Sequence, residues 1–177
     1  MSFSVVTVVF ALLLAAGACI LWFGPGKWPQ LHSRLPRARI AGEVLGITCL
    51  IWAASHVIGM LEGDMLRFVP TIKLIVPALA VLAYFYLDFL FARALGGFLL
   101  LIIHQLLHAA FVEDIALRPL FSLLCYLLAF LGLYFITAPW GMRAILEKAR
   151  DSKSWQRTTS ALLAGLAVAF FGFATMG

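Results

Sequence analysis

The chain has 177 residues, of which 64% are hydrophobic and 12% charged, and its formal net charge is +5. Water-soluble domains carry about 45–50% apolar and about 25% charged residues, and a chain of this length has too little interior to hide such an excess from water. The composition excludes a water-soluble domain and predicts a membrane protein. Its apolar runs are continuous rather than alternating, which predicts helices.

Six stretches are long and apolar enough to cross a bilayer, for which about 20 residues suffice. The first has no basic residue before it, so we expect an uncleaved span and not a signal peptide. The spans cover about residues 3–23, 40–61, 68–87, 94–112, 120–138 and 158–176. The sequence therefore predicts one all-α membrane domain over residues 1–177, a polytopic transmembrane helical bundle.

Residues 140–157, between the last two spans, predict a cytoplasmic amphipathic helix. Met142, Leu146 and Ala149 fall on one side of such a helix, while Arg143 and Arg150 point away from them. We expect this helix to lie on the membrane surface with its basic residues toward anionic lipid. The residues expected at that surface are Trp140, Arg143, Lys148, Arg150, Lys153, Trp155 and Arg157.

The basic residues predict an orientation. With six spans, all but three of the 13 Lys and Arg residues fall on one side, the exceptions being Arg67, Lys73 and Arg118. The positive-inside rule makes the more basic side cytoplasmic and places both termini outside. This bias, without a targeting segment, favours a bacterial cytoplasmic (inner) membrane. Membrane orientation also accounts for the net positive charge. We expect no nucleic-acid partner, because no nucleic-acid-binding motif occurs.

Histidines are the main candidates for chemistry inside the membrane. His104 and His108, four residues apart in the fourth predicted span, lie on one helical face and could bind one metal ion. His56, in the second span, is the candidate third ligand, at about the depth of His108. A haem between facing helices is a further possibility, although His56 is expected nearer the outer surface than His104.

Three interpretations of these histidines remain open. They could form hydrogen bonds between helices without any cofactor, which is the leading expectation. They could instead hold a metal or haem, or line a proton or substrate path. No motif for nucleophilic catalysis, phosphate binding or dinucleotide binding occurs, so we lean against an enzyme.

Small residues at helical spacing predict close helix packing. They are Gly42 and Gly46 in the second span, and Ala161, Gly165 and Gly172 in the sixth. Packing within the chain is the simpler expectation, and docking of a partner is the alternative. Our leading functional hypothesis is a non-enzymatic accessory or scaffold subunit of a membrane complex, in contact with lipid and with other subunits or copies of itself. The alternatives are a haem- or metal-binding redox protein using His56, His104 and His108, and a small transporter or proton path.

Overall fold

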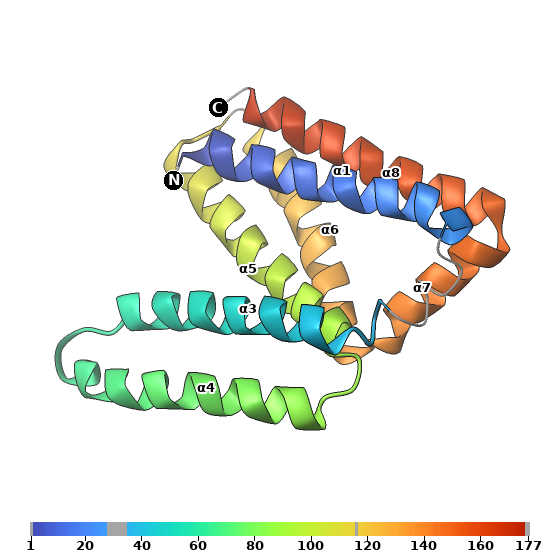
Figure 1. Ribbon diagram of the computed structural model, residues 1–177. Coiled ribbons are helices and arrows are strands. Elements are labelled where there is room, and N and C mark those ends of the chain that lie inside the picture. The colour runs from blue at the N-terminus through green and yellow to red at the C-terminus, as the bar shows by residue number, and fades with distance from the viewer. Residues whose placement is uncertain (1, 28–34, 116, 176–177) are drawn as a thin grey trace.

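The computed structural model describes residues 2–27, 35–115 and 117–175 (Figure 1). These residues form seven α-helices and no strands. The helices are α1 (Phe3–Lys27), α3 (Arg39–Gly59), α4 (Val69–Tyr86), α5 (Leu90–Val112), α6 (Arg118–Thr137), α7 (Trp140–Asp151) and α8 (Lys153–Ala174), with the short 3-10 helix η1 (Gly63–Phe68) leading into α4. Six helices of the described chain are long and apolar enough to span a membrane, which confirms the predicted helical bundle. The protein is thus an integral membrane protein.

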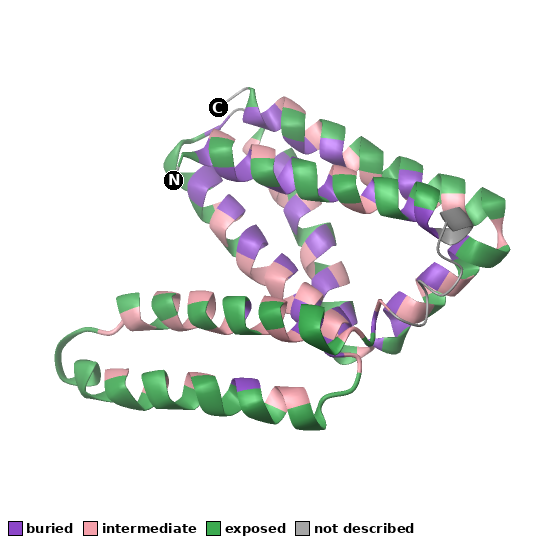
Figure 2. Cartoon of the chain, viewed as in Figure 1, coloured by how far each residue is buried: buried purple, intermediate pink, exposed green. Residues whose placement is uncertain are grey.

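The spans are arranged as three pairs (Figure 1). Helix α1 lies along α8, α3 forms a hairpin with α4, and α5 packs on α6 obliquely between the other two pairs. The deepest core lies where α1, α5, α6 and α8 meet (Figure 2). Phe121 makes edge-to-face contacts there with Phe3 and Phe170, at ring-centroid distances of 5.2 and 5.4 Å. Such aromatic contacts hold the α1–α8 pair on the central pair.

The two ends of the bundle differ in which connections they carry (Figure 1). Both chain termini, the α3–α4 connection and the α5–α6 connection lie at one end. At that end the backbone N–H of Phe3 donates a 2.8 Å hydrogen bond to Oε1 of Glu113. Helix α7, the start of α3 and the start of α5 lie at the other end. We call this second end the basic end, because Arg37, Arg93 and the cations of α7 lie there.

The boundary between α7 and α8 corrects the sequence prediction. Helix α7 ends at Asp151, whereas the interfacial helix was predicted to reach residue 157, and α8 begins at Lys153 rather than at residue 158. Ser152 is extended, with φ −126° and ψ 110°, and its Oγ accepts a 3.3 Å hydrogen bond from the backbone N–H of Trp155. This is an N-cap. Lys153, Trp155 and Arg157 therefore belong to the start of α8.

The apolar face of α7 is covered by the protein's own helices. Met142, Leu146 and Ala149 are buried, and α7 packs on α8, α1 and α6. Helix α7 therefore bridges the α1–α8 pair and the central pair at the basic end (Figure 1). Its polar residues lie on the opposite, more exposed side, and their contact with a membrane surface stays a prediction.

The connection between α4 and α5 is shorter than predicted. Only residues 87–89 separate the two helices, and Phe89 adopts a left-handed conformation, with φ 56°. Helix α5 consequently begins at Leu90 and not at residue 94, so Arg93 lies within its first turn. The Nη1 of Arg93 donates a 3.0 Å hydrogen bond to the carbonyl of Ile136, near the end of α6. This bond ties α5 to α6 at the basic end.

Candidate functional site

The candidate site lies along the contact between α3 and α5, which run in the same direction. A Cβ added to Gly42 would lie 2.6 Å from the backbone nitrogen of Phe91, so the two backbones nearly touch at this point. One turn further, Gly46 faces Ala94, and the Sγ of Cys49 lies 3.8 Å from the Ala94 carbonyl. The absence of side chains at the two glycines allows this close approach.

The same contact continues through aromatic rings to the histidines. Trp52 lies 6.3 Å from Phe98 between ring centroids, and 6.3 Å from His56 on its own helix. The imidazole of His56 then meets that of His104 at 5.6 Å, with the two ring planes at 90°. Contacts on α3 and α5 thus advance together from Gly42 to His56. Two imidazoles from different spans are brought together at the far end of this contact.

This pairing differs from the predicted one. His56 was expected at the level of His108, because both lie close to the ends of their spans. The structure places His56 against His104 instead. Helix α5 runs obliquely to α3 (Figure 1). Two residues equally far from the ends of these helices therefore do not lie at the same depth. The facing partner of His104, which the sequence did not reveal, is therefore His56.

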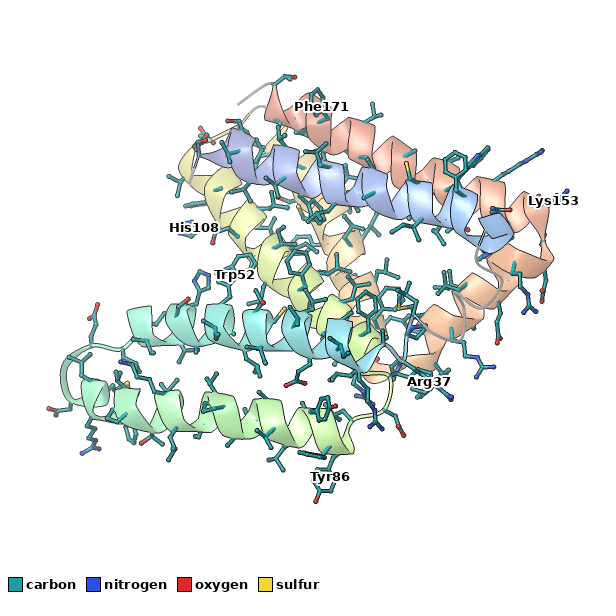
Figure 3. All side chains as sticks on the ribbon, viewed as in Figure 1. Arg37, Trp52, Tyr86, His108, Lys153 and Phe171 are labelled. Atoms are coloured by element: carbon teal, nitrogen blue, oxygen red, sulfur yellow. The ribbon has the colours of Figure 1, made fainter. Side chains whose placement is uncertain are left out.

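His108 lies one turn beyond His104 on α5, where both side chains are exposed (Figure 3). His56 is half-buried beside Trp52. In the described part of the chain, no three His, Cys, Asp or Glu residues are grouped so that they could hold a metal ion. The arrangement offers two facing imidazoles, and any further metal donor would have to come from a ligand or another chain. Metal or haem binding by these histidines stays a prediction.

The small residues of α8 leave open space around their Cβ positions or are exposed. Ala161 and Gly165 are exposed, and a Cβ added to Gly165 or Gly172 would meet nothing within 4 Å. The buried side of α8 consists of other residues, among them Ala167 and Phe170. Ala161 and Gly165 thus face outward while Gly172 is half-buried, and helix packing through this stripe stays a prediction.

Several of the predicted membrane-surface residues contact one another or a neighbouring carboxylate. Arg143 pairs with Glu147 at 2.7 Å across one turn of α7, and Arg150 pairs with Asp151 at 2.8 Å. The ammonium of Lys148 lies 4.2 Å from the centre of the Trp155 ring. Trp140, at the start of α7, is 61% exposed. Part of the charge on this surface is thus neutralised locally.

Two polar side chains outside the predicted site join distant segments. Glu113, after α5, accepts the hydrogen bond from the start of α1. Gln156, in the first turn of α8, donates 3.1 and 2.6 Å hydrogen bonds to the carbonyls of Leu21 and Trp22. The sequence signal for the second contact was Pro25, which has no N–H to offer the carbonyl of Leu21.

These features define a class of protein: a polytopic helical membrane protein with a histidine pair between two parallel spans. Compared with known proteins, the chain matches no family model, no curated protein and no solved structure. The functional argument accordingly rests on the geometry of the chain itself.

Proposed function

We propose that this protein is a non-enzymatic accessory or scaffold subunit of a membrane complex, and that its α3–α4 hairpin contacts the other subunits. The main support is the isolation of α4. This helix packs chiefly on α3, whereas α3 also packs on α5 (Figure 1). In the most apolar 18 residues of the span Gly63–Tyr86, 6% of the residues are buried, compared with 39% in α1 and in α5.

Most of α4 is exposed, as Figure 2 shows, and its exposed residues are mainly apolar. Leu74 is 73% exposed and Phe85 is 70% exposed. Lipid can cover such a face, but a helix held by one neighbour gains little packing energy within its own chain. Helices of another subunit would supply that packing. The outward stripe on α8, with Gly165 at its centre, would allow a second close contact of the same kind.

The remaining architecture also favours a subunit over a self-contained enzyme. The α3–α4 and α5–α6 connections are short at the end opposite the basic end. The polar groups joining the helices, such as Arg93, Glu113 and Gln156, are engaged with the backbone. These groups stabilise the bundle, and their engagement supports a structural role.

Site-specific photo-crosslinking in native membranes tests this proposal. A photoreactive residue at Leu74, on α4, is compared with one at Phe130, which is 70% exposed on α6. We expect Leu74 to form adducts with a second polypeptide that also co-purifies in stoichiometric amount after gentle extraction, and Phe130 to react with lipid. Native mass spectrometry then separates a different subunit from multiples of the 19.4 kDa chain. Lipid adducts alone at Leu74, together with a monodisperse single chain, would refute the proposal.

We also propose that the basic end faces the cytoplasm of a bacterial cell, with both termini outside the inner membrane. The support is the segregation of Lys and Arg, which the positive-inside rule relates to the cytoplasmic side. Alkaline phosphatase fused after residue 177 should be active, and green fluorescent protein at the same point should stay dark. If the green fluorescent protein fusion is fluorescent and the phosphatase fusion is inactive, the C-terminus lies in the cytoplasm and the proposed orientation is wrong.

The contact of His56 with His104 favours a second candidate, a metal- or haem-binding redox protein. Facing imidazoles from two spans can supply two ligands, and ionisable groups inside a membrane are functional candidates by default. This hypothesis predicts that His56→Ala and His104→Ala each remove a bound metal or haem, whereas His108→Ala, further from the pair, removes less. Elemental analysis and absorption spectra of purified protein decide it, since a colourless, metal-free wild type would end this candidate.

A further inference from the structure

A shallow, open groove lies on the surface of the basic end, beside the point where α3 meets α5. It has a volume of about 950 Å³, and its lining includes Arg37, Arg39, Ile40, Val44, Thr48 and Phe91. Phe91, whose backbone Gly42 closely approaches, contributes to the lining from α5. The groove is separated from the histidine pair along α3, because its lining residues on this helix end at Thr48, two turns before His56.

One end of the groove is cationic. Arg37 and Arg39 both line it and are exposed, and no acidic residue is among the lining residues. The guanidinium carbon of Arg37 lies 4.9 Å from the centre of the Phe89 ring, which holds this side chain at the mouth. Glu43 lies on the same helix, one turn after Arg39, but does not line the groove. A planar guanidinium pair is well suited to bind phosphate oxygens.

The rest of the groove is apolar and follows the helix into the membrane. Ile40 is 81% exposed and Val44 is 63% exposed. From Arg39 to Thr48 the helix rises about 13 Å, given about 1.5 Å per residue. A cationic mouth at the membrane surface followed by an apolar channel matches a molecule with an anionic head and a hydrocarbon tail.

We propose that this groove is a binding site for an anionic phospholipid of the leaflet at the basic end. Its phosphate would bind to Arg37 and Arg39, and one acyl chain would lie along Ile40, Val44 and Phe91. Basic pockets between membrane helices bind anionic headgroups in this way. A zwitterionic phospholipid gains less because its own cation opposes the two guanidinium groups. This inference is independent of the proposed subunit role.

Lipid titration monitored by native mass spectrometry tests the site, with phosphatidylglycerol and phosphatidylcholine as the two probes. We expect the wild type to retain one phosphatidylglycerol in preference to phosphatidylcholine. Arg37→Gln with Arg39→Gln should weaken phosphatidylglycerol binding about 30-fold, because each cation near the surface contributes about fivefold. The control, Arg67→Gln with Arg118→Gln, removes the same charge from the opposite end and should leave binding unchanged.

A second pair of variants keeps both arginines and changes only the apolar channel. Val44→Trp fills the groove and should also abolish retention of the lipid, whereas Val57→Trp, exposed on α3 outside the groove, should not. Both proteins should show the melting temperature of the wild type. Equal retention of the two lipids by the wild type, or unchanged retention in both the arginine and the Val44→Trp variants, would overturn the proposal.

Discussion

The side-chain amide of Gln156 donates a 3.1 Å hydrogen bond to the carbonyl oxygen of Leu21. This carbonyl would normally accept from the N–H four residues later, but residue 25 is proline and has none. A neighbouring helix thus supplies the donor that the α1 backbone lacks, as proline in membrane helices requires. The bond also fixes the register of α1 against α8 at the basic end.

Replacing Gln156 by Leu should lower the free energy of unfolding by about 1 kcal/mol, because a part-buried carbonyl loses its partner. In a Pro25→Ala background the same replacement should cost clearly less, since an alanine at this position restores a backbone N–H. Unfolding titrations of the two single variants and the double variant in mixed micelles give the coupling between the two sites. Identical costs in both backgrounds would show that the two residues do not act through Leu21.

Gly42→Ala should destabilise the protein by about 1–3 kcal/mol, because the new methyl group would overlap the backbone of Phe91 and force α3 from α5. The matched control is Gly165→Ala on α8, where the added methyl group meets nothing within 4 Å. That replacement should be neutral or stabilising by up to about 1 kcal/mol, since alanine favours helix. Thermal unfolding in detergent measures both, and equal melting temperatures would contradict the close contact.

Glu113→Ala should loosen the start of α1 and cost about 1 kcal/mol, because the N–H of Phe3 loses its acceptor at a helix N-terminus. Asp114→Asn is the control. It removes a neighbouring charge whose partner, Arg118, lies 3.3 Å away at an exposed site, and it should cost less than about 0.5 kcal/mol. Hydrogen exchange of the first-turn amides of α1 should accelerate in the first variant only.

Arg93→Met should cost about 1–2 kcal/mol, because the carbonyl of Ile136 near the end of α6 loses a charged donor. Arg143→Met, which removes a surface pair within one helix, should cost less than about 0.5 kcal/mol. Hydrogen exchange should report faster opening of the last turn of α6 for Arg93→Met. Equal effects of the two variants would contradict the prediction that the Arg93 contact stabilises the protein more than a surface pair does.

Span positions followed from the sequence because a bilayer sets the length of an apolar run, and the first predicted span begins where α1 begins, at Phe3. The end of α7 could not be predicted in the same way, because the segment 153–157 is polar enough to continue a surface helix. The missed signal was Ser152, a good N-cap residue placed three positions before Trp155.

Helix partners were harder to predict than helix positions. The contact of His56 with His104 depends on the oblique path of α5, which no periodicity within either span encodes. The orientation of the α8 stripe could not be predicted for a related reason, because a row of small residues is compatible with both a buried and an outward face. Gly42, by contrast, lies at a very close helix contact, where only a residue without a side chain fits.

The pairing of α1 with α8 has a consequence for the order of assembly during synthesis. Helix α1 leaves the ribosome before α8, its most extensive partner among the described helices, and about 125 residues separate the end of α1 from the start of α8. At about 5–20 residues per second, α1 waits roughly 6–25 s for its partner. During that interval its buried face, including Phe10, must be covered by lipid or a chaperone, so insertion of the nascent chain is the stage most sensitive to loss of either.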